Sequence, residues 1–234
     1  MTGTFINIAS ILAGGLLGLL LGSSLKEQLK QTIVSGLGLF TLLYAISLFL
    51  ETQNALIVLG SLLIGILLGE WWRIEDGLTV LGVKLEARFN HSWQSESSAR
   101  FIKGFLTSTL LFCIGPMAIL GSLQDGLSGD SNTLIVKSIL DAFAALAFAS
   151  SLGSGVLFSA IPVLLYQGTI SLLAQQVQRV ATPEMMNELS ATGGVILAGL
   201  AISNILEIKK IRTGNFLPAL LIAPLIVFLL SLIK

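Results

Sequence analysis

Charged residues are scarce in this chain of 234 amino acids: they make up 11% of it, whereas 54% of the residues are apolar. A soluble domain needs roughly 25% charged residues to cover its surface, so the composition excludes an ordinary soluble protein. The formal net charge is zero, and no basic run is longer than Lys209 and Lys210. The sequence therefore gives no indication of a nucleic-acid partner.

Cysteine and histidine each occur once, as Cys113 and His91. A single cysteine forms no intrachain disulfide, and a metal centre that needs several imidazoles or thiolates is excluded. A rhomboid-like serine hydrolase needs a histidine within the membrane, but His91 is predicted in a loop. Intramembrane aspartyl chemistry needs two facing aspartates at depth, and only Asp141 is clearly there. We therefore expect no enzyme, no metal and no cofactor.

Long apolar runs are what the chain has instead. Runs of about 18 or more residues with few charges predict transmembrane helices, and the mean hydropathy of +0.90 agrees. We therefore predict an all-α polytopic transmembrane helical bundle of about eight spans, forming a single domain over residues 1–234. The first run lacks a basic segment before it and is long enough to span, so we interpret it as a helix and not as a cleavable signal. The predicted spans are residues 3–22, 33–50, 54–69, 102–121, 134–151, 155–174, 190–206 and 216–233.

Lysine and arginine predict the orientation, because they collect in cytoplasmic loops. With eight spans and the N-terminus outside, ten of these residues fall in cytoplasmic loops and two, Arg179 and Lys234, fall on the other side. Merging the fifth and sixth spans weakens this bias, so we predict eight spans with both termini outside. The ten cytoplasmic residues are Lys26, Lys30, Arg73, Lys84, Arg88, Arg100, Lys103, Lys209, Lys210 and Arg212.

Two peptides are nearly the same: AISLFLE at residues 45–51 and AISNILE at residues 201–207. Over the longer windows 36–51 and 192–207, six of sixteen positions are identical. The predicted topology gives these two helices opposite directions. They therefore indicate an inverted repeat that relates helices 1–3 to helices 6–8, a construction found in many transporters. Chance similarity is the alternative, since Leu, Ile, Ala and Ser are common in every span.

The segment 70–100 is predicted to be a cytoplasmic loop that contains an interfacial amphipathic helix. Trp71 and Trp72 suit the lipid headgroup region. Four apolar residues then follow at helical spacing, with the charged residues mostly elsewhere on the helix: Ile74, Leu78, Leu81 and Leu85. A polar hinge is predicted at residues 90–98. Anchoring to the membrane is the simpler role for this helix, and docking or regulation is the alternative.

Two charged residues, Lys137 and Asp141, lie within the fifth predicted span. They are four positions apart and so share one face of a helix. Each charge costs about 2.5–3.5 kcal/mol at the centre of a bilayer, so such residues turn inward and find partners. A structural ion pair is one interpretation. A gate, counter-ion or proton-coupling carboxylate in a polar pathway is the other.

The end of the fourth span combines helix breakers with acidic residues. Pro116 frees a carbonyl one turn earlier, and Gly115 removes side-chain cover there. At membrane depth such backbone is tolerated where it is buried or lines a cavity. Asp125 and Asp130 follow and offer oxygen ligands at the outer mouth. A solvated turn is the simpler explanation of these two aspartates, and a vestibule that collects cations is the alternative.

The sixth span adds a proline and a buried amide, although such amides more often join helices by hydrogen bonds than bind ligands. Small residues four apart in the first and third spans allow close helix contacts, within one chain or in a homo-oligomer. No residue is expected to be catalytic. The candidate transport pathway comprises eight residues: Gly115, Pro116, Asp125, Asp130, Lys137, Asp141, Pro162 and Gln167.

Several motifs are distributed over nearly the whole chain. They are GTFIN at 3–7 with GG at 14–15, LFCIGPMAILGS at 111–122 with DGL at 125–127, KSILD at 137–141, FSAIPV at 158–163, YQG at 166–168, TGG at 192–194 and NFLPAL at 215–220. In these motifs the chain resembles the YdfK/YqgA-type bacterial membrane proteins. The resemblance implies a multi-pass protein of the cell inner (plasma) membrane. It implies no catalytic residues, because that family has no assigned function.

Two functions follow from these patterns. The first is an integral membrane transporter or channel for a small solute or ion, with the polar site near mid-membrane and rocking of the two repeats for alternating access. Because both a lysine and an aspartate are available, either sign of solute charge is compatible with it. The alternative is a non-transporting membrane scaffold or regulatory subunit that acts through the 70–100 loop.

Overall fold

A computed structural model of the chain describes residues 1–22, 24–89, 95–178 and 182–233. This part of the chain is helical, with short connections and no strand. Seven stretches of helix are long and apolar enough to cross a membrane, and a bent helix pair gives an eighth. The predicted all-α bundle of about eight spans is thus confirmed. The predictions for His91, for Arg179 and Lys234, and for most of the hinge at 90–98 lie outside the described residues.

The structure contains twelve α-helices within these ranges, together with one π-helical turn, η1, and one 3-10 turn, η2. In chain order they are α1 (Thr2–Gly22), α2 (Glu27–Phe49), α3 (Ala55–Trp72), α4 (Ile74–Phe89), α5 (Ser95–Ile114), α6 (Pro116–Ser128), α7 (Asn132–Leu152), α8 (Gly155–Phe158), α9 (Ala160–Leu172), α10 (Ala174–Gln178), α11 (Pro183–Leu200), η1 (Ala201–Ile205), η2 (Thr213–Phe216) and α12 (Ala219–Ile233).

Two helices begin about two turns earlier than the apolar runs predict. Helix α2 starts at Glu27 and α11 starts at Pro183, because polar first turns extend each helix beyond its apolar part. The start of α11 has an explicit signal. The Thr182 side chain accepts a hydrogen bond from the backbone N–H of Met185 at 3.2 Å, and proline at the first helical position needs no partner for a missing N–H.

The fourth span is broken in the middle, as its sequence predicts. Helices α5 and α6 meet at Gly115 with a bend of 60°. Gly115 adopts an extended conformation, with φ −66° and ψ 144°, because a residue before proline is disfavoured in helical geometry. A second break separates α7 from α8 at Gly153, whose φ of +84° suits glycine. Interrupted helices in the middle of the chain are therefore confirmed.

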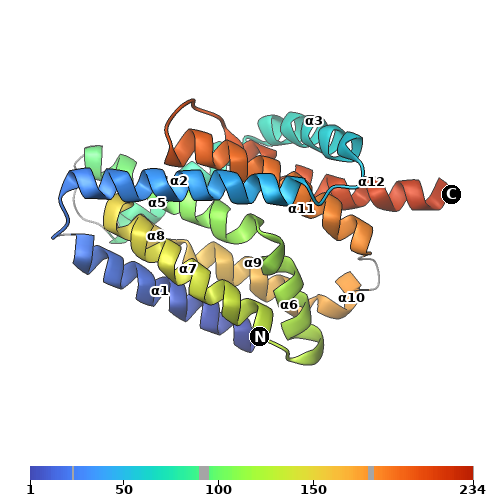
Figure 1. The fold of residues 1–234 in the computed structure, drawn as a ribbon, viewed down its shortest axis with the longest axis horizontal. Coiled ribbons are helices and arrows are strands. Elements are labelled where there is room, and N and C mark those ends of the chain that lie inside the picture. Colours follow the sequence, from blue (N-terminus) through green and yellow to red (C-terminus); the bar gives the residue numbers. More distant parts are fainter. Residues whose placement is uncertain (23, 90–94, 179–181, 234) are drawn as a thin grey trace.

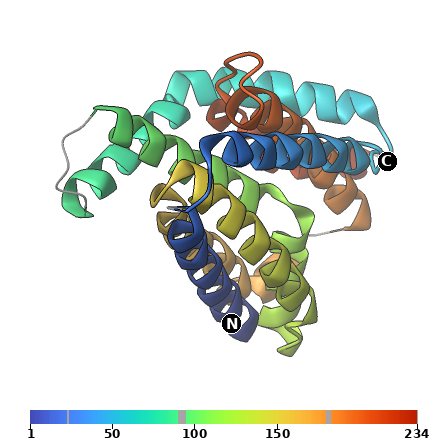
Figure 2. The same cartoon turned by 60° about the vertical axis from the view of Figure 1, so that its left-hand side comes forward.

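The helices form two groups that share α5 (Figures 1 and 2). We call α1 with α6–α10 the α1 group, and α2, α3, α11, η1, η2 and α12 the α2 group. Helix α5 serves both hydrophobic cores. Its Phe112 packs with Phe148 and other residues of the α1 group. Its Leu110 and Ile114 pack with Ala45 and Leu197 of the α2 group. The groups also meet around Leu189, where α11 contacts α6 and α10.

Close contacts fix the relative directions of the long helices. Helices α1 and α7 run parallel, since Gly14 lies against Ala142 and Gly18 lies against Leu146. Helices α2 and α11 are antiparallel, and so are α3 and α12. Lysine and arginine residues gather where α2 and α5 begin and where α1, α7 and η1 end. We call this the basic end of the bundle; it carries Lys30, Arg100, Lys103 and Arg212, and it lies on the left in Figure 1.

Helix α4 follows α3 after a single residue, Arg73, in the left-handed conformation at φ 53°. It packs against α5 and η2, with Leu78 half-buried in the core of the α2 group. Leu81, expected on the same face as Leu78, is 42% exposed. The face of α4 that meets protein therefore differs in part from the predicted apolar stripe.

Candidate functional site

Two cavities lie along the seam where α2 faces α7, and they share these two helices as walls. The first, which we call the mid-bundle cavity, has a volume of about 260 Å³ and lies beside the break between α5 and α6. The second, the end cavity, has a volume of about 510 Å³ and lies at the basic end. The candidate site is thus a line of space between the two helix groups.

The mid-bundle cavity is mostly apolar with a charged pair in its wall. Lys137 and Asp141 on α7 both line it, and their side chains form an ion pair within the helix. Both residues are buried. The Lys137 ammonium also lies 5.8 Å from the centre of the Phe112 ring on α5, an arrangement that favours the charged amine. The pair therefore satisfies itself at a depth where a lone charge is expensive.

Hydroxyl and amide groups surround this pair. Thr41 and Tyr44 on α2 line the cavity opposite α7. Asn7 on α1 is fully buried and lies beside the Asp141 carboxyl, but its amide makes no hydrogen bond of ordinary geometry within the described residues. The aspartate thus has a second polar neighbour available if its bond to Lys137 opens.

The mouth of the mid-bundle cavity faces the flank of the molecule. Phe40 on α2 and Phe143 on α7 line it and are 65% and 69% exposed. Leu140, which is also exposed, lies between the cavity and the same surface. Because these residues belong to apolar helices long enough to span a bilayer, the cavity opens sideways between α2 and α7.

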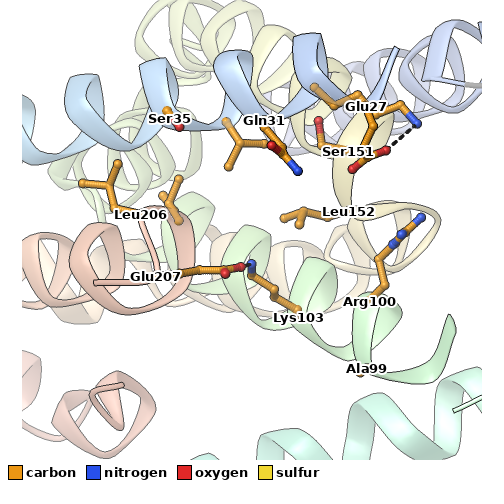
Figure 3. Close-up of a pocket in the computed structure, with 13 residues that line it drawn as sticks. Glu27, Gln31, Ser35, Ala99, Arg100, Lys103, Ser151, Leu152, Leu206 and Glu207 are labelled. Atoms are coloured by element: carbon orange, nitrogen blue, oxygen red, sulfur yellow. Dashed lines mark hydrogen bonds and ion pairs between the residues drawn. The ribbon is translucent and has the colours of Figure 1, made fainter. Parts of the chain in front are cut away.

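The end cavity is polar by contrast, as Figure 3 shows. Glu27 and Gln31 on α2 face Arg100 and Lys103 on α5 across it. The ammonium of Lys30 lies 3.6 Å from the Glu27 carboxylate, and Lys103 pairs with the Glu207 carboxylate. Three basic and two acidic side chains thus line this cavity among the described residues.

An apolar barrier separates the two cavities. Val34 and Leu37 lie one turn apart on α2, one lining the end cavity and the other the mid-bundle cavity. Phe148 and Leu152 do the same on α7. Together with Ile205 at the end of η1, these side chains belong to one hydrophobic cluster. A polar solute passes between the cavities only if this barrier opens.

The structure brings together three of the eight residues predicted for the pathway. Gly115, Lys137 and Asp141 all line the mid-bundle cavity. Pro116 begins α6 directly after Gly115 and sets the bend there. The helix break and the charged pair thus lie at one cavity, and their part in a transport pathway stays a prediction.

The other predicted residues line neither cavity. Asp125 is buried within α6 and accepts a hydrogen bond from the backbone N–H of Gly3 at 3.1 Å, so it is not the solvated turn residue that we expected. Asp130 is exposed and accepts from the N–H of Asn132 at 3.0 Å, at the start of α7. This contact is typical of a turn residue next to a helix start.

Pro162 and Gln167 lie on α9, in the α1 group. Gln167 is fully buried, and neither end of its amide has a hydrogen-bond partner among the described residues. We find no bond by which it joins two helices, the role that buried amides most often have. It lines neither cavity.

Sequence reasoning missed the residues that α2 contributes. Thr41 and Tyr44 fall three apart in the mainly apolar second half of α2, a weak signal that identifies no site alone. It also missed Glu188 on α11, which is 2% exposed. The Glu188 carboxylate accepts bonds from the Thr52 hydroxyl at 2.7 Å and from two backbone N–H groups of the α2–α3 connection at 2.8 and 3.0 Å. It thereby fastens α2 to α11 at the end away from the basic end.

An ion-pair network fastens the α2 group to α4 at the basic end. The Arg212 guanidinium pairs with Glu70 at 3.1 Å and with Asp76. Hydrogen bonds from Arg212 and Arg73 hold the pKa of the Asp76 carboxyl below its ordinary value. Burial has the opposite effect on Glu75, whose pKa is raised although its carboxylate accepts the Gly214 N–H at 3.0 Å. The pKa values of the two neighbouring carboxyls are therefore shifted in opposite directions.

The sequence matches the family described as "Protein of unknown function (DUF554)" over residues 2–228. The chain belongs to this family. It is 36% identical over 221 residues to "Uncharacterized protein YqgA" of Escherichia coli (strain K12), a match that covers 94% of each chain. It is 30% identical over 234 residues to "Uncharacterized membrane protein YdfK" of Bacillus subtilis (strain 168), covering 98% of this chain and 97% of YdfK. The predicted resemblance to a YdfK/YqgA-type family is confirmed. No solved structure matches the DUF554 chain significantly.

Proposed function

We propose that this DUF554 protein is an integral membrane transporter or channel for a small solute or ion. The observation that carries the proposal is the Lys137–Asp141 pair in the wall of a cavity at mid-bundle. Ionisable residues within membrane spans are rare, and they mark solute pathways and proton relays. The end cavity, aligned along the same two helices, provides an approach to this site from the basic end.

The division into two helix groups supports an alternating-access mechanism. Helices α1 and α7 pack backbone against backbone, and the α2 group is fastened at both ends by Glu188 and by Arg212. The seam between the groups contains the two cavities, separated by the apolar barrier. Rocking of one group against the other opens the apolar barrier and exposes the mid-bundle cavity to alternate sides.

The inverted repeat is part of this proposal. Gly38 on α2 lies against Ile205 and Leu206, and Gly194, the matching residue of the second peptide, lies against Leu48 and Phe49. This reciprocal packing supports a two-fold axis in the plane of the bundle. Because α2 and α11 both belong to the α2 group, the seam crosses each repeat and does not separate one repeat from the other.

We further propose location in the inner (plasma) membrane with the basic end in the cytoplasm. The described lysine and arginine residues that were predicted as cytoplasmic gather at this end, in agreement with the positive-inside rule. Trp71 and Trp72, which are strongly exposed at the end of α3, suit the headgroup region there. YdfK is named a membrane protein, which supports a location in a membrane.

Liposome flux tests the proposal. Purified protein is reconstituted and a panel of labelled ions, organic acids, amines and sugars is offered from either side, with Asp141→Asn as the variant and Asp130→Asn, an exposed aspartate outside the cavities, as its matched control. We expect flux of at least one solute that Asp141→Asn alters and Asp130→Asn does not. No flux of any solute by correctly folded protein overturns the proposal.

The scaffold alternative makes a different prediction. Helix α4 uses one face against α5 and η2 and leaves Val80, Leu81 and Val83 exposed. If the protein acts through this surface, a specific partner co-purifies and is lost when Val80 and Leu81 are made polar. Flux that survives these substitutions favours the transporter.

A further inference from the structure

The chemistry of the mid-bundle cavity narrows the class of solute, on the premise that the proposed transport uses this cavity. Its wall contains one cation, Lys137, and one anion, Asp141, among the described residues. A charged solute entering here must replace one member of this pair, because a third uncompensated charge is costly in an apolar site. The solute therefore competes either with Asp141 for the lysine or with Lys137 for the aspartate.

Three features favour competition for the lysine. The Lys137 ammonium rests over the Phe112 ring, which continues to favour the charged amine after Asp141 leaves it. Thr41 and Tyr44 bring hydroxyl donors to the opposite wall, and such donors suit anionic oxygens. The end cavity has three basic and two acidic side chains among the described residues, an excess that attracts anions.

When a solute anion displaces Asp141 from Lys137, protonation removes the charge of the aspartate. A proton on Asp141 converts the carboxylate to a carboxylic acid, and the unpartnered Asn7 amide beside it can bond with either form. The other titratable groups near Asp141 are Tyr44 on α2 and Cys113 on α5. Before binding, the site contains a lysine cation and an aspartate anion. After binding, it contains a lysine cation, a solute anion and a neutral aspartic acid, so its net charge is zero in both states.

The rest of the cavity is suited to an apolar chain. Its mouth is formed by Phe40, Leu140 and Phe143 on the membrane-facing flank. Its volume of about 260 Å³ equals that of roughly nine water molecules in the liquid, so a molecule of about nine non-hydrogen atoms fits.

From these observations we infer that the mid-bundle cavity takes a small organic monoanion with an apolar chain, its acidic head on Lys137, together with one proton on Asp141. The carboxylate of a short fatty acid has this chemistry. The proton and the anion enter and leave together, so the occupied and empty cavities have the same net charge.

Calorimetry with two probes of similar size and opposite charge, hexanoate and hexylammonium, tests the inference on the full-length protein in detergent or nanodiscs. We expect hexanoate to bind and hexylammonium not to bind. Titrations in buffers of different ionisation enthalpy measure proton uptake, which we expect to be about one proton per hexanoate. Binding of hexylammonium in place of hexanoate, or binding of hexanoate by the wild-type protein without proton uptake, overturns the inference, and neither result depends on a variant.

Variants assign the roles of the two residues. Lys137→Met should weaken hexanoate binding at least about tenfold, since a charge-assisted hydrogen bond is lost. Asp141→Asn, a mimic of the protonated acid, should retain hexanoate binding but lose proton uptake and the dependence on pH. Lys84→Met removes an exposed cation on α4 that lines neither cavity, and it is the matched control. Equal hexanoate affinity of Lys137→Met and the wild-type protein contradicts the assignment of Lys137.

Flux separates this inference from the proposed function. If hexanoate binds as expected but no solute crosses the liposome membrane, the anion site holds and transport is wrong. If a cation or a neutral solute crosses while hexanoate does not bind, transport holds and the anion site is wrong.

Discussion

Helix α7 meets α1 and α2 in opposite ways. Against α1 it packs so closely that a Cβ atom added to Gly14 would lie 2.2 Å from the carbonyl oxygen of Ala142, and one added to Gly18 would lie 2.2 Å from that of Leu146. Against α2 it leaves two cavities with an apolar barrier between them. One helix thus has a sealed side and an open side.

This difference separates what is rigid from what can move. Without a hydrophobic driving force between helices in lipid, close backbone contact is a main source of stability, so α1 and α7 behave as one body. The α2 side lacks such contact with α7, and α2 is instead fastened to α11. The seam is the place where a small rearrangement breaks few contacts.

Disrupting the close contact between α1 and α7 should have the largest effect on folding. We expect Gly18→Leu to abolish folding, because a side chain there meets the backbone of α7 and neither helix can yield without separating from the other. The measurement is the yield of monodisperse protein after extraction and its thermal unfolding in detergent.

Gly36→Leu is the matched control on α2, since no atom lies within 4 Å of an added Cβ at Gly36. We expect it to fold as the wild-type protein does. Equal tolerance of leucine at Gly18 and Gly36 would show that the α1–α7 contact is not the rigid element that we describe.

The next largest loss of stability is expected on the side of α7 that faces α2, from the buried pair of Lys137 and Asp141. Lys137→Met leaves Asp141 as an unpaired buried carboxylate, and we expect the free energy of unfolding to fall by about 3–5 kcal/mol. Lys103→Met, which breaks the exposed pair with Glu207, should cost less than about 1 kcal/mol.

The double variant Lys137→Met with Asp141→Leu checks whether the pair serves stability or function. Replacement of both charges by apolar side chains should recover most of the lost stability while transport is lost. Wild-type flux in the stable double variant contradicts a functional role for the pair.

The sequence predicted the charged pair and the broken helix, because both depend on residues close together in the chain. Lys137 and Asp141 share a face through helical spacing alone, and Gly115 with Pro116 breaks the backbone locally. The partners across the seam, Thr41 and Tyr44, depend on which helix packs against α7. Apolar helices look alike in composition, so this choice is visible only in the packed bundle.

The small residues spaced four apart in the first and third spans also show that sequence spacing does not identify a packing partner. Their spacing predicted close contacts, and the structure shows those contacts within the chain, between α1 and α7 and between α3 and the start of α12. Spacing alone did not identify the partner helices. It also gave no sign that Glu188 adds hydrogen bonds to the close packing of α11 against the far end of α2, because a glutamate near a helix start is an ordinary feature of sequences.

A weaker effect is expected where α2 is fastened to α11. Glu188→Gln removes the charge that three donors of the α2–α3 connection share, and we expect a loss of about 1.5–3 kcal/mol in the free energy of unfolding. Glu184→Gln, an exposed position on the same helix, is the matched control and should change stability little. If the two variants lose the same stability, Glu188 is not what holds α2 to its group, and the contrast between the two sides of α2 weakens.

The smallest change in stability is expected from substitutions at the basic end, where Arg212 joins the α2 group to α4. The pKa of Asp76 is lowered by hydrogen bonds from Arg212 and Arg73, so its carboxylate stabilises the folded state above the ordinary pKa of 3.8 and this contribution is lost as the pH falls through the lowered value. Asp76→Asn should therefore unfold slightly earlier than the wild-type protein at pH 7, with a difference that closes in acid and in high salt.

The neighbouring Glu75 gives stability the opposite dependence on pH. Its pKa is raised, chiefly by burial, so its contribution to stability is greatest below the ordinary value of 4.5 and declines as the pH rises through the raised value. Glu75→Gln should remove this decline and flatten the pH profile of thermal unfolding, whereas Asp76→Asn flattens the acid limb alone. If both substitutions change the pH profile in the same direction, Glu75 does not dock α4 onto η2 in the way that its hydrogen bond from the Gly214 N–H indicates.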